Sequence, residues 1–302
     1  MEYVRCSLCG SDDTIVRYPS TLDNTSDKGQ WAAYACTYSG YGRHHTIVQC
    51  QKCGLVYTNP RLDQHDIINT YQAVQDPLYL EERAGRVLTF ERHLKPLERI
   101  TGPPVGRSLL DVGCHVGVFV EIAAEHGWDA WGVEPSRWAV EQAQALGLCV
   151  VQGTLDTADL PEAYFDVVTM WDVIEHLADP LNALKRAHAL LGPNGLIVVH
   201  TIDIESWFAR LLGSRWPWLM EMHIYYFSRR TLQLMLEKCG FTMIKAVPQG
   251  RYLRLGYLMN RVGALVPWVG RPAEWLVSIL KLRGLAVPVK FGDLFTVYAR
   301  RA

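Results

Sequence analysis

The sequence predicts an α/β fold built around a mostly parallel β-sheet, and three observations point to it. Between residues 108 and 201, short apolar runs alternate with amphipathic stretches at the spacing of βαβ units, which requires a parallel sheet with right-handed crossovers. A buried strand at 108–112 runs into a glycine-containing turn at 113–117 and then into a helix at 118–126. A second short strand at 130–133 ends in the acidic residue Glu134.

Length and composition are those of a folded globular protein. The 302 residues, 49% of them hydrophobic and 20% charged, are enough for one sizeable α/β domain with smaller appendages. A net charge of −1 argues against a general nucleic-acid binder. We find no signal peptide and no apolar run long enough to span a bilayer, so we expect a cytoplasmic location.

The turn at 113–117 predicts a ligand site. Its glycines let the backbone approach a ligand, and the following helix presents free N–H groups. Asp111 ends the first strand, and Glu134 ends the next one, 23 positions later, where an acidic side chain suits the hydroxyls of a ribose. Gly113 and Gly117 are separated by three residues and do not form G-x-G-x-x-G, which disfavours a nicotinamide-dependent oxidoreductase.

The remaining elements of the central domain follow in order. We expect a helix over 137–146, strands over 149–152 and 165–170, a helix over 181–191 and a strand over 196–201. An aromatic-rich insertion at 203–227 precedes a helix over 228–240, for which Ser228 is a suitable N-cap. Two more strands, 243–247 and 294–299, complete the sheet around a second insertion at 251–290.

Two motifs resemble those of class I S-adenosyl-L-methionine (SAM) methyltransferases. Residues 111–117 resemble motif I, D-x-G-C-x-x-G, and residues 171–180 resemble motif IV with its E-H-L-x-D-P run. The resemblance implies a Rossmann-like sheet whose last two strands are antiparallel, with SAM as the cofactor. The implied cofactor-binding residues are Asp111, Gly113, Cys114, Gly117, Glu134, Pro135, Thr154, Leu155 and Trp171. His115 stands where many members carry glycine, which reshapes the pocket beside the methionine moiety.

The first 60 residues predict a zinc-binding module. Cys6 and Cys9, like Cys50 and Cys53, form C-x-x-C-G knuckles, and two knuckles supply four thiolates for a tetrahedral Zn²⁺ with a structural role. A redox pair and a disulfide framework are the alternatives. We expect an insertion in this zinc-ribbon-like module around residues 20–43, a helical lid or linker over 61–104, and the SAM-binding domain over 105–302.

Methyl transfer requires alignment of acceptor and methyl, and often a base that removes a proton from the acceptor. Residues 223–228 resemble the H-x-x-Y-F-S segment of zinc-containing sugar methyltransferases, in which a histidine and a neighbouring tyrosine face the acceptor. This implies His223 as general base with Tyr225 beside it. His176 and Glu175 of the E-H-L run are further candidates, and His200 lies at the end of its strand. A structural, hydrogen-bonded histidine is the alternative in each case.

The expected function is SAM-dependent methylation of an oxygen or carbon of a small molecule, with a sugar or lipid-linked glycan as the first expectation. Sugar C-methyltransferases carry a further C-terminal domain that this sequence does not include, which leaves O-methylation open.

The insertion at 251–290 holds seven Lys/Arg and one acid among many apolar residues. It predicts either peripheral contact with an anionic membrane or a helical cap on the core or on a second subunit. The alternative function is a non-catalytic scaffold subunit.

Overall fold

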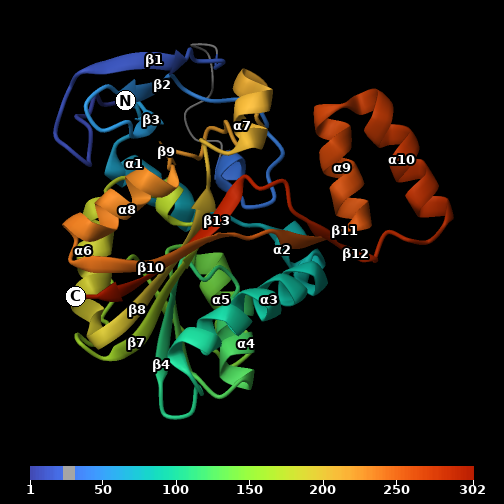
Figure 1. Cartoon of the computed structure of the whole chain (residues 1–302). Helices are drawn as coiled ribbons and strands as arrows, with labels where there is room; N and C mark the ends of the chain where they lie inside the picture. The colour runs from blue at the N-terminus through green and yellow to red at the C-terminus, as the bar shows by residue number, and fades with distance from the viewer. Residues whose placement is uncertain (23–30) are drawn as a thin grey trace.

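A seven-stranded sheet forms the centre of the molecule, with strand order β10-β13-β8-β7-β4-β5-β6 (Figure 1). The computed structural model describes residues 1–22 and 31–302, so residues 23–30 of the expected insertion lie outside the described part. The strands are β4 (Ser108–Val112), β5 (Asp129–Glu134), β6 (Cys149–Gln152), β7 (Phe165–Trp171), β8 (Leu191–Ile202), β10 (Phe241–Pro248) and β13 (Leu294–Arg301). Strands β4 to β8 pair in parallel, and β13 is antiparallel to both of its neighbours. This confirms the Rossmann-like fold class and the antiparallel last pair.

Helices cover both faces of this sheet because side chains alternate along each buried strand. Leu109 of β4 points to one face and packs with α3 (Arg83–Thr101), α4 (Val118–Glu125) and α5 (Arg137–Ala145). Leu110 points to the other face, where α6 (Pro180–Leu190) and α8 (Arg229–Lys238) lie. Helix α8 begins at a capping box of Ser228 and Thr231, which confirms the predicted N-cap.

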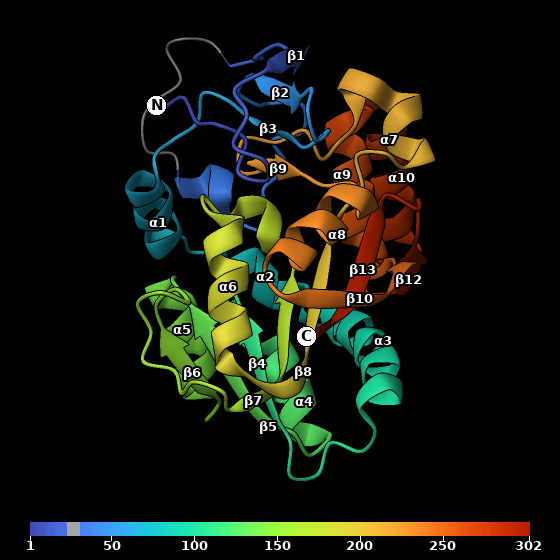
Figure 2. The same ribbon diagram turned by 60° about the vertical axis from the view of Figure 1, so that its left-hand side comes forward.

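The cysteine-rich N-terminal region forms a second, four-stranded sheet. Its strands are β1 (Thr14–Tyr18), β2 (Ile47–Cys50), β3 (Val56–Thr58) and β9 (Tyr225–Tyr226). Strand β9 comes from the aromatic-rich insertion and pairs with β3 at Val56 and Tyr57. Figure 2 shows this small sheet at one end of the main sheet. Its side chains share one hydrophobic core with α6 and α8, so the N-terminal sheet is built into the body of the molecule.

Residues 61–104 follow the first three strands of the N-terminal sheet in the chain and are largely helical. They contain α1 (Gln64–Ala73), α2 (Pro77–Glu81) and α3, of which α1 and α2 begin at aspartate N-caps. Short helical turns elsewhere are η1 (Trp31–Tyr34), η2 (Ile174–His176), α7 (Trp207–Leu212) and η3 (Gly213–Arg215).

The insertion at 251–290 forms a helical hairpin that projects from the body (Figure 1). A two-stranded ribbon of β11 (Arg251–Arg254) and β12 (Ala286–Val289) carries α9 (Leu255–Leu265) and α10 (Pro267–Ile279). The two helices cross at glycines, since a Cβ on Gly270 would lie 2.2 Å from backbone atoms of Gly263. Among the described residues, no helix combines the length and apolar content needed to cross a membrane.

Candidate active site

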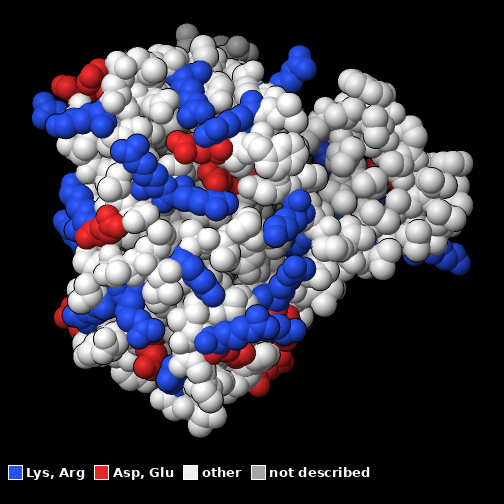
Figure 3. Space-filling view, viewed as in Figure 1, with Lys and Arg blue, Asp and Glu red and all other residues white. Residues whose placement is uncertain are grey.

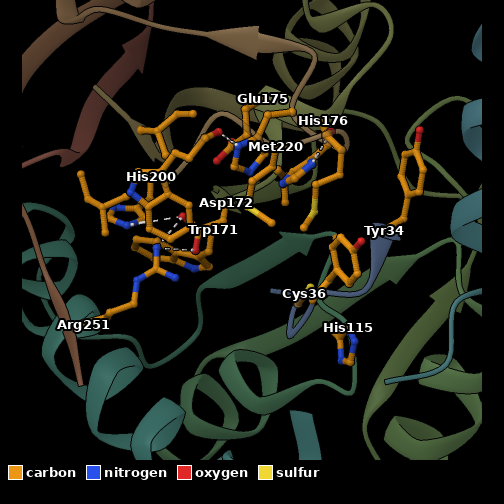
Figure 4. Close-up of a pocket in the computed structure, with 18 of the residues that line it drawn as sticks. Tyr34, Cys36, His115, Trp171, Asp172, Glu175, His176, His200, Met220 and Arg251 are labelled. Atoms are coloured by element: carbon orange, nitrogen blue, oxygen red, sulfur yellow. Dashed lines mark hydrogen bonds and ion pairs between the residues drawn. The ribbon is translucent and has the colours of Figure 1, made fainter. Parts of the chain in front are cut away.

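A cavity of about 490 Å³ lies at the carboxyl ends of the parallel strands, where open α/β sheets bind ligands. The ends of β4, β5, β7 and β8 line it with Asp111, Glu134, Trp171 and His200. The N-terminal sheet region, α1 to α3 and the hairpin helix α9 close the other sides. Figure 4 shows side chains of the N-terminal region, such as Tyr34, of the main sheet, such as Trp171 and His200, and of the hairpin base, Arg251, around the same space.

The glycine turn after β4 forms part of the cavity wall. Gly113, with φ +66°, lines the cavity, and its N–H donates to the Val133 carbonyl at 2.8 Å, which ties the turn to β5. Asp111 is buried and accepts a 2.6 Å hydrogen bond from the Thr169 hydroxyl. Burial raises the pKa of Asp111 to about 8. Gly117 does not line the cavity. A Cβ there would lie 2.6 Å from Leu148, so this glycine allows the helix after the turn to pack closely.

Glu134 is fixed with its carboxylate at the cavity wall. Its Oε2 accepts from the backbone N–H of His115 and its Oε1 from that of Ser136, both at 2.9 Å. Burial raises the pKa of Glu134 to about 7. A carboxylate oxygen has two lone pairs, so each oxygen can accept one further hydrogen bond from a ligand hydroxyl.

His115 adopts a left-handed backbone conformation, with φ +52°. This is the position where many class I SAM methyltransferases, which the sequence resembles, carry glycine. The His115 ring stacks on Tyr79, with centroids 3.8 Å apart, and the Arg86 guanidinium lies 3.4 Å from the centre of the same tyrosine ring. Both ring nitrogens of His115 and the Arg86 Nε are buried without a partner among the described residues. The orphaned N–H groups at this end of the cavity are therefore free to bind a polar ligand group.

The other predicted cofactor residues also meet at this cavity. Its lining includes Cys114, Pro135, Thr154, Leu155 and Trp171. Thus every residue of the predicted cofactor set except Gly117 reaches the same space, although they come from four separate turns.

The three candidate bases Glu175, His176 and His223 form one cluster on the cavity wall, with ligand atoms within 4.8 Å of one another. The Nδ1 of His223 lies 2.7 Å from the Trp218 carbonyl, and the Nδ1 of His176 lies 3.0 Å from that of Met222. Because a carbonyl only accepts, the Nδ1 of His223 carries the proton and its Nε2 is left as an acceptor. The Nδ1 of His176 also lies 2.9 Å from the Tyr71 hydroxyl, which can donate as well as accept.

Burial sets the charge state of this cluster. It lowers the pKa of His223 to about 3 and that of His176 to about 4. It raises the pKa of Glu175 to about 8. At neutral pH both imidazoles are therefore uncharged and able to accept a proton, while the Glu175 carboxyl is mostly protonated.

Tyr225 does not join this cluster. Its ring stacks on Tyr57 and Phe227 in the N-terminal sheet, and its hydroxyl lies 3.2 Å from the Arg61 guanidinium. It is absent from the cavity lining among the described residues. Tyr225 belongs to β9 and pairs with Tyr57 of β3, whereas His223 precedes this strand, so the pairing directs Tyr225 into the core shared with the N-terminal sheet.

Two charged cavity residues, Asp172 and Arg251, were not among the site residues predicted from the sequence, and they lie beside the candidate His200. The Arg251 guanidinium lies 3.3 Å from the carboxylate of Asp172, whose other contact is the His200 Nε2 at 3.6 Å. His200 Nδ1 lies 2.8 Å from the Thr296 hydroxyl. Asp172 has φ +55°, a conformation that aspartate tolerates better than most residues. Its place just after a buried strand was the available signal. The sequence gives no such signal for Arg251, because this residue lies in the hairpin base, 79 residues after Asp172.

The four knuckle cysteines meet at a separate site. Their sulfur atoms all lie within 4.8 Å of one another, with Cys6 to Cys53 at 3.4 Å and Cys9 to Cys50 at 3.5 Å. Zn–S bonds of about 2.3 Å place the sulfurs of a tetrahedral site about 3.8 Å apart. The arrangement therefore fits one zinc ion with small adjustments.

Comparisons with known proteins agree on the class of domain. A family model described as a methyltransferase domain matches residues 79–246. A ubiquinone biosynthesis O-methyltransferase of Pectobacterium atrosepticum is 30% identical over 162 residues, which cover 47% of this chain and 67% of the relative. Another, from Azorhizobium caulinodans, is 34% identical over 134 residues, which cover 41% and 53%. The chain thus spans between half and two thirds of the length of these relatives.

Solved structures with a similar fold include a SAM-dependent methyltransferase from Thermotoga maritima, with a TM-score of 0.48 and 21% identity over 73% of this chain and 91% of the other. One from Mesorhizobium loti has a TM-score of 0.45 and 19% identity over 68% and 96%. The cysteine cluster and the hairpin lie outside the residues matched by the family model.

Proposed function

Because this chain belongs to the methyltransferase domain family and is a SAM-dependent methyltransferase, we propose that it methylates a hydroxyl oxygen of a small amphiphilic acceptor. The observation that carries the proposal is that Glu134 and the cluster of Glu175, His176 and His223 line the same cavity. The relatives are named O-methyltransferases, which supports oxygen over carbon as the acceptor atom.

The residues present fit the cofactor. The free lone pairs of the Glu134 carboxylate suit the two ribose hydroxyls, and Leu155 and Trp171 offer apolar surface to the adenine. The orphaned nitrogens of Arg86 and His115 suit the carboxylate of the amino-acid end. When bound, SAM supplies an electrophilic methyl group on a sulfonium.

The chain's own residues bind, orient and deprotonate the acceptor. A neutral His223 can take the hydroxyl proton at Nε2 while its Nδ1–H remains bonded to the Trp218 carbonyl. The hydrogen bond holds the ring in one tautomer, so the accepting nitrogen faces the cluster. Tyr34, Tyr71 and the hairpin enclose the cavity and keep water from the acceptor oxygen.

The cavity wall favours an acceptor with an apolar or aromatic body. Besides the histidines, its lining is rich in aromatic side chains from all parts of the chain. These are Tyr34, Tyr38, Tyr41, Tyr71, Tyr79, Phe90, Trp171, Phe208, Trp218, Tyr252, Tyr257 and Phe291. Such a wall suits rings and hydrocarbon. The expected sugar acceptor receives no support from it or from the relatives, which are named for ubiquinone biosynthesis.

Replacing Glu134 with alanine tests the cofactor site. We expect the Kd for SAM to rise by about 100-fold, equal to about 2.7 kcal/mol, because the variant loses the ribose acceptor and leaves two backbone N–H groups unpaired. Isothermal titration calorimetry measures it. The matched control is Glu141→Ala, since Glu141 is exposed on α5 and pairs only with Arg137. Equal SAM affinity of both variants would contradict the proposal, and absent binding by the parent chain would favour the scaffold alternative.

We also propose that the cysteine cluster binds one structural zinc ion. The sulfur distances, the glycine after each knuckle, with φ +74° at Gly10 and +84° at Gly54, and the burial of Cys6 and Cys50 support it. The cluster does not line the cavity, so zinc has no part in the transfer itself.

The hairpin supports a third proposal, contact with an anionic membrane surface. Its outer side exposes Trp268 by 79% and Trp275 by 67%, with several aliphatic neighbours, and Figure 3 shows this projection as mostly uncharged. Exposed tryptophan beside basic residues is typical of segments that lie in the membrane interface. Of the seven basic residues in the hairpin, the exposed ones are Arg271, Lys281, Arg283 and Lys290, and the single acid is Glu274. The inner side of α9 lines the cavity, so an apolar acceptor could enter from the membrane.

Co-sedimentation with lipid vesicles tests the membrane proposal. We expect the chain to bind vesicles of phosphatidylglycerol and phosphatidylcholine, and the double variant Trp268→Ser/Trp275→Ser to bind about tenfold more weakly, because each indole contributes buried apolar area. Leu146→Ser, at the exposed residue that follows α5, is the control. Equal binding by the double variant would contradict the proposal. A dimer in analytical ultracentrifugation that the double variant abolishes would instead assign this face to a second copy.

A further inference from the structure

The hairpin contributes one buried cation to the cavity, Arg261 of α9. Its side chain is 7% exposed, and its Nη2 donates to the Thr37 carbonyl and the Tyr257 hydroxyl. Its Nη1 is buried with no hydrogen-bond partner, and within residues 1–22 and 31–302 no carboxylate forms an ion pair with it. Burying a guanidinium without a counter-charge is unfavourable, so the site is incomplete as it stands.

The surroundings of Arg261 stabilise a cation only in part. Its guanidinium lies 4.4 Å from the ring centre of Tyr257 and 5.8 Å from that of Tyr41. Contacts of this kind help a desolvated cation, but they supply no net negative charge. Both tyrosines and Arg261 line the same cavity as Glu134 and His223.

The other two arginines that line the cavity differ from Arg261: one already has an ion-pair partner, and the other lies beside the glycine turn. Arg251 forms an ion pair with Asp172 at 3.3 Å. Arg86 lies over Tyr79, which stacks on His115 of the glycine turn, and so faces the cofactor end. Arg261 belongs to the hairpin, outside the residues that the family model matches. Arg261 is therefore available to recognise an acceptor specific to this chain, as distinct from the cofactor that the family shares.

We propose that Arg261 binds an oxyanion of the acceptor, a carboxylate or a phosphate, and so selects acceptors that carry one beside their apolar body. This inference rests on the proposed function, since it assigns a substrate class to the same cavity. The Nη1 carries two N–H groups with no partner in the protein, so it can donate to an oxygen of either oxyanion, and the guanidinium charge strengthens that hydrogen bond.

Ligand binding to the full chain saturated with S-adenosylhomocysteine tests the inference. The probes are 2-naphthoate and 2-naphthyl phosphate, each against its neutral counterpart, 2-naphthamide or 2-naphthol. We expect the parent chain to bind at least one anionic probe ten times more tightly than its counterpart. The anionic probe with the larger affinity ratio over its neutral counterpart identifies the oxyanion as a carboxylate or a phosphate. Arg261→Met should reduce the preference to less than twofold, and Arg261→Lys should keep part of it.

The control is Arg271→Met, because Arg271 is exposed on α10, and it should retain the full preference. The parent chain gives a test that does not depend on folding of any variant. A parent that binds S-adenosylhomocysteine but shows no preference for either anion contradicts the inference and leaves the proposed function standing. A preference that Arg261→Met retains also contradicts it. If Arg261→Met instead weakens S-adenosylhomocysteine binding, the guanidinium belongs to the cofactor site and the inference fails.

Discussion

Replacing His223 with alanine is expected to lower the turnover of methyl transfer by about 100- to 10,000-fold, the usual contribution of a general base. SAM affinity should change less than twofold, because the proposed cofactor contacts are made by Glu134 and the glycine turn rather than by His223. Transfer of radiolabelled methyl from SAM into lipid and aromatic-hydroxyl extracts measures the first quantity, and calorimetry measures the second. His65→Ala, at an exposed site on α1, is the matched control.

The pH dependence of the same assay is a second readout. Burial lowers the pKa of His223 to about 3, so the imidazole stays neutral and able to accept a proton as the pH falls through 6. With SAM saturating, titration of His223 should therefore cause no loss of rate near pH 6.5, where an exposed histidine becomes protonated. Protonation of Glu134, whose pKa burial raises to about 7, acts on SAM affinity instead. Equal turnover by His223→Ala and the parent would remove His223 from the mechanism.

Removal of zinc is expected to have the largest effect on stability. Structural zinc sites contribute about 10 kcal/mol or more of apparent binding free energy, which exceeds the net stability of many domains. We expect one zinc per chain by elemental analysis and a clear fall in melting temperature for Cys53→Ser or after chelation. Cys149→Ser should melt like the parent, because Cys149 is exposed on β6.

This effect should reach the active site. The N-terminal sheet shares a core with α6 and α8, and the Thr58 N–H donates to the Ile224 carbonyl next to His223 at 2.8 Å. Loss of the sheet therefore removes support from the base as well as the wall formed by Tyr34 and Tyr41. A chain that contains no metal after growth with zinc, and whose melting is insensitive to chelators, would contradict the zinc proposal.

The main sheet could be predicted from the sequence because its signals are local. Strand β6, for example, begins and ends at the predicted residues, 149 and 152. Parallel strands buried on both faces form continuous apolar runs, and the glycine turn fixes the junction with α4. Strand β9 could not be predicted. It is two residues long and pairs with β3, where Val56 lies opposite Tyr226, 170 residues later in the chain, and no local pattern indicates such a partner.

The candidate site divides in the same way. Asp111 and Glu134 follow from their places at strand ends, and the structure brings both to the cavity. Tyr41, Arg251 and Arg261 come from segments beside the central domain, where the sequence shows only aromatic and basic residues in an insertion. The role of the two arginines depends on which side of the hairpin faces the cavity, and that of Tyr41 on how the N-terminal region packs against it. Tertiary packing decides both. Tyr225 shows the reverse case, since a residue close to His223 in sequence points into the N-terminal sheet.

The central claim is that the cavity between Glu134 and His223 holds SAM. Native mass spectrometry of the purified chain, before and after addition of SAM, tests it most directly. The account predicts one SAM or S-adenosylhomocysteine per chain, displaced by excess sinefungin and absent from Glu134→Ala. A chain that shows no adduct at saturating SAM, or an adduct that Glu134→Ala retains in full, would contradict it.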